Sequence, residues 1–381
     1  MNLIALKMLF GERAKSTMLL SGICFATILM IQGLALGLGL LATSYATAVN
    51  VTAPIWVANP LIDQVVMNNQ PLLDTDVYRV RSVAGVAWAA QLYVGGAQAR
   101  ILDRGGVSQN VTLIGLDTET LAGAPTDFVA GSLDDLRQPD AVIADASAMI
   151  RLSPDPNVPL KVGETFEMND RRARIVGVVN TRSASHGQAG YIFTTYNRAI
   201  QYVPAQRKMT TYVLAAPVAG QTAVDVARRI SAATGLNAFT SEEIRNSSAW
   251  YFIRNSPVPF IVGLIVGIGF VIGTVISGQT FFTFILENTR HLGVLRAMGT
   301  QTRRLALMIL VQAMVAGLIG YGLGVGIISL VIAVMPADAP LKFGLPVLLV
   351  TFVPVLGICA VAALLGIRRM ARIEPAIVFR A

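Results

Sequence analysis

The chain has 381 residues, of which 54% are hydrophobic and only 14% are charged, and its formal net charge is +8. A soluble domain carries roughly 25% charged residues and could not hide this much apolar surface without leaving large exposed patches. The composition therefore excludes an ordinary soluble protein and predicts a membrane protein.

The first apolar run follows a short basic segment and ends near Ala46-Thr47-Ala48, which is similar to a signal-peptidase site. Signal peptides have apolar cores of roughly 7–15 residues, whereas this apolar stretch runs from Met18 to Leu41. A helix needs roughly 20 apolar residues to cross a bilayer. We therefore predict a retained transmembrane helix at residues 16–49, with a cleaved signal peptide as the less favoured alternative.

Residues 50–254 have the pattern of a soluble mixed α/β domain. The segments QNVTLIGLD, TFEMNDRRARIVGVVNT and AGYIFTTYNRAIQYV are rich in β-branched and aromatic residues, which favours strands. The segment TAVDVARRISAATG is amphipathic and stops at a glycine, which favours a helix. The block is long enough for one domain, in one piece or in two lobes.

This block carries no sequence motif for catalysis or metal binding. It has no cysteine, no G-x-S-x-G elbow and no H-E-x-x-H pair. The chain's two cysteines, Cys24 and Cys359, lie in predicted spans, and its two histidines, His186 and His291, lie on opposite predicted sides of the membrane. We therefore predict no catalytic residue and no metal site, and we leave the substrate-binding residues unassigned.

Three more apolar runs follow this block. We predict transmembrane helices at residues 255–286, 305–335 and 343–367, joined by a cytoplasmic segment at 287–304 and a short outer loop at 336–342. None of the four predicted spans contains Asp, Glu, Lys, Arg or His. Ion-coupled carriers and voltage sensors place such residues within their spans, so this class of protein is disfavoured.

The energy for any work that this protein does must then come from elsewhere. A phosphate-binding loop needs a lysine directly after a glycine, so that backbone amides and the lysine hold the phosphates. None of the five lysines follows a glycine. If ATP drives this protein, a partner binds it.

The net charge indicates the orientation in the membrane. The segments 1–15, 287–304 and 368–381 together hold 11 basic and 3 acidic residues, whereas residues 50–254 hold 18 of each. Positive residues are retained on the cytoplasmic side. We therefore predict cytoplasmic N- and C-termini and an extracytoplasmic domain at 50–254. A basic total can also indicate nucleic-acid binding, but this distribution is a topology signal, so we predict no nucleic-acid partner.

Glycines recur at a spacing of four within the predicted spans. This spacing lets two helix backbones approach closely. Two explanations of this spacing stay open: the glycines pack helices within one chain, or they form an interface with a second copy. The pairs are Gly33/Gly37, Gly263/Gly267, Gly269/Gly273, Gly320/Gly324 and Gly322/Gly326.

The segment at residues 287–304, ENTRHLGVLRAMGTQTRR, concentrates charge between two spans. Leu292, Leu295 and Met298 recur at a spacing of three, so they lie near one face of a short helix. Gly299 is a natural helix stop. A topology anchor would need only the arginines, so the additional apolar face indicates a surface for a partner.

This segment resembles the E…R…E-I-G-I-L-R-A-L-G signature of the MacB/FtsX-like ABC permeases, also called type VII or mechanotransmission transporters. It departs from many relatives at His291-Leu292, where they have a glutamate-isoleucine pair. The tail ARIEPAIVFR resembles the family's closing A-x-x-x-P-x-x-x-L-R, with Phe379 in place of leucine, and KVGETFEMNDRRARIVGVV is similar to part of the family's outer domain. The signature positions shared are Glu287, Arg290, Gly293, Leu295, Arg296, Ala297 and Gly299.

The chain is therefore identified as a member of this family, closest to the DevC- and HrtB-like permeases, which carry no fused ATPase. The resemblance implies a polytopic α-helical membrane protein with four transmembrane helices and a large mixed α/β extracytoplasmic domain between the first and second. It implies that two permeases pair, as a homodimer or a heterodimer, in the bacterial cytoplasmic (inner) membrane. It also implies that the 287–304 segment is a coupling helix docked on a separate ABC ATPase subunit. ATP and magnesium belong to that ATPase, and the chain itself has no cofactor and is not an enzyme. The implied coupling residues are Glu287, Arg290, Leu292, Gly293, Leu295, Arg296, Met298 and Gly299.

The resemblance also implies an activity. ATP hydrolysis by the partner moves the outer domain, which exports or extracts an amphiphilic substrate such as a lipid, lipoprotein, haem or peptide. Residues 1–15 would form an amphipathic helix on membrane lipids at the inner surface. Two alternatives stay open: an FtsX-like subunit that signals to an extracytoplasmic partner without transport, and a tripartite exporter with a periplasmic membrane-fusion adaptor and an outer-membrane duct.

Overall fold

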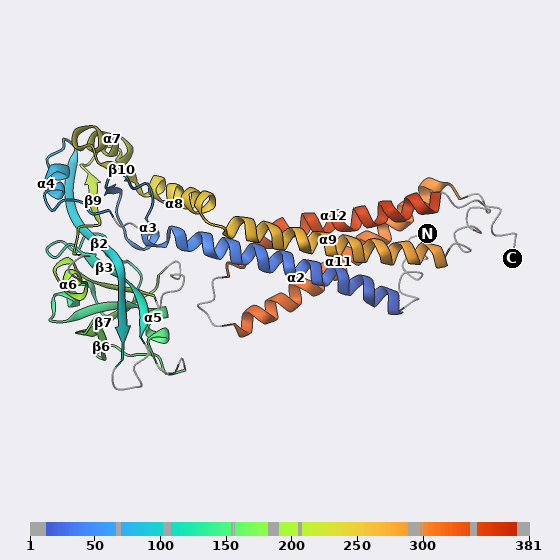
Figure 1. Cartoon of the computed structure of the whole chain (residues 1–381), viewed down its shortest axis with the longest axis horizontal. Helices are drawn as coiled ribbons and strands as arrows, with labels where there is room; N and C mark the ends of the chain where they lie inside the picture. Colours follow the sequence, from blue (N-terminus) through green and yellow to red (C-terminus); the bar gives the residue numbers. More distant parts are fainter. Residues whose placement is uncertain are drawn as a thin grey trace. The chain divides into compact units, whose positions relative to one another are not determined.

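The computed structural model describes residues 13–65, 70–101, 108–153, 155, 157–181, 190–204, 208–288, 294, 298, 300–335 and 341–371. The chain divides into two compact units (Figure 1). One, here called the helical unit, comprises residues 1–39 and 257–381. The other, the sheet unit, comprises residues 40–256.

The helical unit is built from four long apolar helices. Within the described part of the chain, these four are long and apolar enough to cross a membrane. Their interiors carry no charged side chain, because the charges lie at the helix ends. The helices are α2 (Arg13–Ser44), α9 (Val258–Glu287), α11 (Thr302–Val334) and α12 (Leu345–Ala371).

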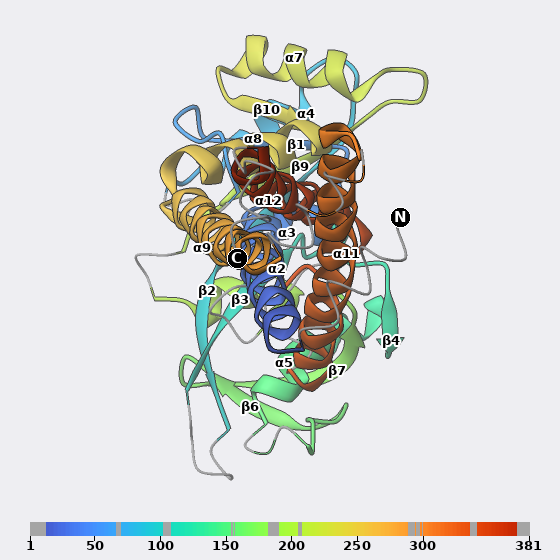
Figure 2. The same cartoon turned by 90° about the vertical axis from the view of Figure 1, so that its right-hand side faces the viewer.

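Helices α2 and α12 each pack against both α9 and α11 (Figure 2). Small residues allow these close approaches, as expected where helices associate without a hydrophobic driving force between them. The Tyr321 hydroxyl of α11 joins the last two helices: it donates to the Leu348 carbonyl of α12 at 2.6 Å and lies 3.2 Å from the Thr351 hydroxyl. The Tyr321 ring also meets Phe352 edge-on, with ring centroids 5.2 Å apart.

The five glycine pairs divide into two groups. Three of them pack within the chain: Gly33/Gly37 meets Ile265 and Val262 of α9, Gly269/Gly273 meets Leu29 and Ala26 of α2, and Gly320/Gly324 meets Ile23 and Thr27 of α2. The other two, Gly263/Gly267 and Gly322/Gly326, have no described atom within 4 Å of a Cβ placed on them.

The described residues of the sheet unit form a mixed sheet of ten strands. Its order is β10-β1-β9-β2-β3-β8-β5-β7-β4, and β6 pairs with β2 and β7. The pairs β3–β8 and β5–β7 are parallel. The strands are β1 (Ile55–Ala58), β2 (Val86–Arg100), β3 (Gln109–Leu116), β4 (Phe128–Ala130), β5 (Ala141–Asp145), β6 (Thr165–Met168), β7 (Arg171–Val179), β8 (Tyr191–Thr195), β9 (Tyr212–Pro217) and β10 (Asn237–Thr240).

The long strand β2 joins the two halves of this sheet. Its first half pairs with β9, and its second half pairs with β3. Buried apolar side chains pack the α4 and α7 helices onto the first half and α5 and α6 onto the second. The helices of this unit are α3 (Ala46–Asn50), α4 (Asp76–Arg81), α5 (Ala146–Arg151), α6 (Tyr196–Tyr202), α7 (Ala223–Thr234) and α8 (Ser241–Asn255), with a 3-10 helix, η2, at Leu133–Arg137.

The predicted fold class is confirmed: four candidate membrane helices, with a large mixed α/β domain between the first and second. The predicted helix around α7 is also confirmed, and it ends at Gly235, whose φ of 72° is the left-handed conformation that glycine adopts easily. The strand predicted for AGYIFTTYNRAIQYV was wrong in its second half, because α6 follows β8 directly. Tyr196, Ala199 and Tyr202 bury one face at a helical spacing of three, and this packing overrides the strand preference of their aromatic side chains.

Candidate functional site

The predicted coupling segment begins at the end of α9. Glu287 is the last residue of that helix, and its carboxylate forms an ion pair with the ammonium group of Lys15 on α2. The Glu287 side chain keeps 47% of its surface exposed. Asn288, which follows, caps the helix by donating from its side chain to the Phe284 carbonyl at 3.0 Å.

Two residues in the middle of the segment are described, Val294 and Met298. The Met298 amide donates to the Val294 carbonyl at 3.0 Å. The side chain of Met298 is 73% exposed and that of Val294 is 43% exposed, so both are available to a partner. The other predicted coupling residues lie outside the described residues: Arg290, Leu292, Gly293, Leu295, Arg296 and Gly299. The predicted amphipathic helix at 1–15 also falls largely outside them.

A pocket of about 540 Å³ lies in the sheet unit between α3, the loop at residues 123–127, the end of β7 and the start of α8. Asp127, Glu242 and Arg245 are among its lining residues. Helix α8 starts there with a reciprocal cap: the Thr240 hydroxyl accepts from the Glu243 amide at 3.2 Å, and the Glu243 carboxylate accepts from the Thr240 amide at 2.8 Å. Helices α3 and α8 contact each other beside this pocket.

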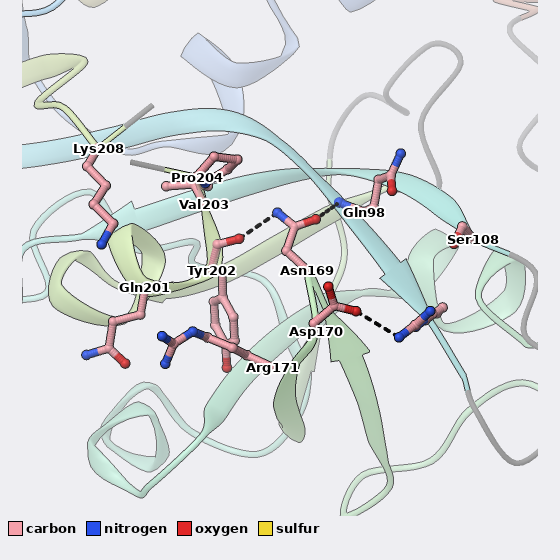
Figure 3. Close-up of a pocket in the computed structure, with 11 residues that line it drawn as sticks. Gln98, Ser108, Asn169, Asp170, Arg171, Gln201, Tyr202, Val203, Pro204 and Lys208 are labelled. Atoms are coloured by element: carbon pink, nitrogen blue, oxygen red, sulfur yellow. Dashed lines mark hydrogen bonds and ion pairs between the residues drawn. The ribbon is translucent and has the colours of Figure 1, made fainter. Parts of the chain in front are cut away.

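A second pocket of about 470 Å³ also lies in the sheet unit. It is formed by the end of β2, the turn between β6 and β7, and the C-terminal end of α6 with the residues that follow (Figure 3). We call it the turn pocket. It is lined by Gln98, Arg100, Ser108, Asn169, Asp170, Arg171, Gln201, Tyr202, Val203, Pro204 and Lys208.

The turn pocket is held together by Asn169. Asn169 and Asp170 form the two-residue β6–β7 turn with φ values of 47° and 63°, a conformation that Asn and Asp tolerate better than most residues. The side-chain oxygen of Asn169 accepts from the Gln98 amide at 3.1 Å, and its side-chain nitrogen donates to the Tyr202 carbonyl at 2.5 Å (Figure 3). One side chain thus ties the turn to β2 and to α6.

Of the described basic side chains that line the turn pocket, one forms ion pairs and two do not. Arg100 donates to Glu167 at 2.9 Å and to Asp170 at 2.8 Å. Among the residues that the structure describes, neither Arg171 nor Lys208 has an ion-pair partner, and both side chains are exposed.

Tyr202 forms the buried wall of the pocket. Its hydroxyl donates to the Arg172 carbonyl at 2.9 Å. Burial raises the pKa of Tyr202 to about 12, against the lowering effect of the Arg198 guanidinium. The sequence analysis missed this pocket, although the Asn-Asp dipeptide between two strand-like runs was a hairpin signal.

Two family models match the chain. Residues 16–233 match the MacB-like periplasmic core domain, and residues 263–375 match the C-terminal part of the FtsX-like permeases. The chain belongs to the MacB/FtsX-like ABC transporter permeases. The family predicted from the 287–304 signature is thereby confirmed, and with its four apolar helices this permease is an inner-membrane protein.

Several known proteins are similar to this permease. An uncharacterized ABC transporter permease of Mycobacterium tuberculosis is 24% identical over 372 residues, which cover 97% of this chain and 95% of that protein. The macrolide export ATP-binding/permease protein MacB of Azoarcus sp. is 21% identical over 226 residues, or 57% of this chain and 34% of that protein. A putative hemin transport system permease protein HrtB of Staphylococcus haemolyticus is 21% identical over 222 residues, or 57% of this chain and 58% of that protein.

Solved structures with some likeness are extracytoplasmic domains. The periplasmic region of MacB from Actinobacillus actinomycetemcomitans is 16% identical, with 55% of this chain and 95% of that chain covered and a TM-score of 0.37. The extracellular domain of the transporter YknZ from Gram-positive bacteria is 13% identical, with 50% of this chain and 99% of that chain covered and a TM-score of 0.35.

Proposed function

We propose that this permease is the membrane subunit of an ABC exporter or extractor that moves an amphiphilic substrate, such as a lipid, lipoprotein, haem or peptide. The observation that carries the proposal is the pair of family matches, at residues 16–233 and 263–375, which joins a MacB-like outer domain to an FtsX-like membrane region. A second permease copy completes the assembly. An adaptor and an outer-membrane duct would extend it to a tripartite exporter.

A separate ABC ATPase subunit supplies the energy and holds the ATP and magnesium. The mycobacterial relative supports this division, since it is named a permease alone and aligns over 95% of its length. The absence of any Gly-Lys dipeptide in the sequence also supports it, because a phosphate-binding loop requires one.

The segment at 287–304 couples the two subunits. It begins where α9 ends at Glu287, and α11 begins at Thr302, so a partner bound to it pulls on the ends of two membrane helices. Met298 and Val294 supply exposed apolar surface within it. Apolar anchors that become buried at an interface commonly dominate affinity.

A movement of α2 and α9 can reach the sheet unit through the backbone. Helix α3 follows α2 after a single residue, and two residues separate the end of α8 at Asn255 from the start of α9 at Val258. Helices α3 and α8 contact each other. A tilt of α2 relative to α9 would therefore act directly on the contact between α3 and α8.

The uncharged interiors of the spans favour a transport route in which the substrate does not cross the membrane through a polar channel. Their interiors hold no charged side chain, whereas polar pathways through a membrane use ionisable residues. We place the N- and C-termini in the cytoplasm, because the three basic segments are retained there. A non-transporting subunit that signals to an extracytoplasmic partner is the second candidate, favoured by the FtsX-like match at residues 263–375.

The coupling proposal is tested by changing Leu295 to Asp. A charge in the apolar contact should cost about 2 kcal/mol or more, or about thirtyfold in affinity for the ATPase. The variant should insert normally but lose the ATPase in pull-down, together with permease-stimulated ATP turnover. Thr300→Asp, which adds the same charge beyond the predicted helix stop, is the control and should keep both. A Leu295→Asp protein that binds and stimulates its ATPase normally contradicts the proposal.

A further inference from the structure

We propose that the turn pocket binds the oxyanion group, phosphate or carboxylate, of a small hydrophilic ligand through Arg171 and Lys208. This site is distinct from the amphiphile and the ATPase of the proposed function. It lies within the sheet unit, and its binding does not depend on the coupling segment.

Charge is the first argument. Residues 50–254 hold equal numbers of basic and acidic side chains, yet the pocket is lined by three cations and one carboxylate. Arg100 is neutralised by Glu167 and Asp170. The positive charge of Arg171 and Lys208 is left for a ligand, since neither has an ion-pair partner among the described residues.

Both cations line the same pocket, which makes one anion their shared ligand in this proposal. In Figure 3, the Lys208 and Gln201 side chains and the guanidinium end of Arg171 are drawn to the left of the Tyr202 ring. A guanidinium group binds a carboxylate or phosphate in a two-pronged contact, and an ammonium group adds a point charge. The amide of Gln201 offers a further donor beside them.

Size and polarity decide the kind of ligand. The volume of about 470 Å³ falls within the range of small-molecule sites, about 300–1,000 Å³. Apart from Tyr202, only Val203 and Pro204 contribute apolar side chains, while amides and a hydroxyl complete the lining. A lipid tail would find little apolar surface there. The pocket instead fits a molecule whose remaining groups are hydroxyls or amides.

The pocket is also preorganised. Asn169 fixes the turn through its contacts with Gln98 and Tyr202, and Arg171 is the first residue of β7 directly after that turn. The Tyr202 hydroxyl bonds to the next residue of the strand, at the Arg172 carbonyl. The backbone that carries Arg171 therefore does not have to order itself when the ligand binds, which lowers the cost of binding.

The experiment is calorimetric titration of the purified full-length chain in detergent, without its ATPase. The probes are inorganic phosphate, citrate and glucose 6-phosphate, with glucose as the uncharged control. We expect saturable binding, at one site per chain, of at least one anionic probe and none of glucose. Phosphate against citrate distinguishes a phosphate ligand from a carboxylate ligand, and glucose 6-phosphate above inorganic phosphate indicates that hydroxyl groups contribute.

Three variants test the assignment. Arg171→Gln and Lys208→Gln should each weaken the binding at least tenfold. Arg172→Gln removes the same charge from the neighbouring residue, whose side chain lies on the opposite face of β7 and outside the pocket lining, and it should retain the binding. Equal weakening by all three variants, or no saturable binding of any anionic probe up to roughly 10 mM, overturns the proposal.

Discussion

Gly317 of α11 lies so close to Cys359 of α12 that a Cβ atom placed on the glycine would come within 2.5 Å of the cysteine sulfur. Cβ atoms essentially never approach a neighbour this closely, so the contact requires the missing side chain. The same close approach recurs further along α11, where that helix meets α2. Close approach of helix backbones at glycines thus helps to assemble the helical unit.

The contact between α11 and α2 predicts a strong effect of adding one methyl group. A Cβ at Gly320 would lie 2.8 Å from the Ile23 Cβ, and one at Gly324 would lie 2.7 Å from the Thr27 Cβ. Gly320→Ala and Gly324→Ala should each destabilise the protein by about 1–3 kcal/mol, as expected for overpacking. Unfolding of the purified chain in mixed micelles with increasing SDS measures this change.

The control lies on the same helix. A methyl group added at Gly322 or Gly326 would have no described atom within 4 Å. Gly322→Ala and Gly326→Ala should therefore leave stability unchanged or raise it slightly, because alanine favours a helix over glycine by about 1 kcal/mol. Equal losses at all four positions would show that this face of α11 is packed as tightly as the other.

Arg198 of α6 makes hydrogen bonds to backbone carbonyls at and just before the start of β5, in the second half of the sheet. Its guanidinium donates to the Ala141 carbonyl at 2.7 Å and to the Gln138 carbonyl at 2.8 Å. Burial lowers the pKa of Arg198. Removing the guanidinium takes the charged donor from these carbonyls, and a hydrogen bond to a charged group contributes about 1.5–3 kcal/mol. The Thr194 hydroxyl and the Ala141 amide still donate to the Ala141 and Gln138 carbonyls, respectively. Arg198→Met should therefore lower the denaturant midpoint of the chain, whereas Arg228→Met, at an exposed position of α7, should not.

The raised pKa of Tyr202 predicts that the protein loses stability at alkaline pH. The Tyr202 pKa is raised from 10.0 to about 12 in the folded state, so the neutral phenol is favoured by folding. The contribution of the neutral Tyr202 phenol to folding stability is complete below pH 10 and is lost as the pH rises through about 12. Tyr202→Phe should be less stable at neutral pH by about 1 kcal/mol, because it lacks the hydrogen bond to Arg172.

Since phenylalanine does not ionise, the stability difference between the wild type and Tyr202→Phe should narrow between about pH 10 and pH 12. Denaturant unfolding of both proteins at a series of pH values measures that difference directly. Lysines and other tyrosines titrate equally in both proteins and cancel. A difference that stays constant up to pH 12 would contradict the raised pKa.

The sequence predicted the parts of this fold that depend on local pattern. Four spans follow from uncharged runs longer than a bilayer, and α7 follows from its amphipathic period and the glycine that ends it. Helix α6 was missed because Tyr196 and Tyr202 favour strands locally, although tertiary packing buries them at a helical spacing. The faces of α11 were equally ambiguous: Gly320 and Gly322 are two residues, or about 200°, apart on a helix, and only the packed structure shows which one meets α2.

The turn pocket could not be predicted from one sequence. Its residues come from three distant stretches, near positions 98–108, 169–171 and 201–208. They meet because β6 pairs with the end of β2 and because Asn169 reaches the Tyr202 carbonyl. Such pairings of distant strands leave no periodic signal in a single chain. The predicted coupling residues differ in this respect, since a family signature marks them within 13 consecutive positions, and they stay a prediction.

The lack of a Gly-Lys dipeptide predicts that the purified permease neither binds nor hydrolyses ATP by itself. Radiolabelled ATP at roughly micromolar concentration should pass through a column of the immobilised chain without retention. Adding the partner ATPase should restore retention and turnover. ATP retained by the isolated permease would require a nucleotide site of another design in this chain.

The charge distribution predicts that positions 108 and 300 lie on opposite sides of the membrane, with position 300 inside. Ser108 is an exposed residue of the sheet unit, and Thr300 lies just before α11. Each is replaced by cysteine in turn, and intact cells are treated with a membrane-impermeant thiol reagent. The native Cys24 and Cys359 are 9% and 0% exposed, so they should add little background. Ser108→Cys should react in intact cells, whereas Thr300→Cys should react only after the cytoplasmic membrane is opened, which also confirms that its thiol is accessible. Equal labelling of both variants in intact cells would reject this topology, and with it the placement of the coupling segment on the side where ATP is found.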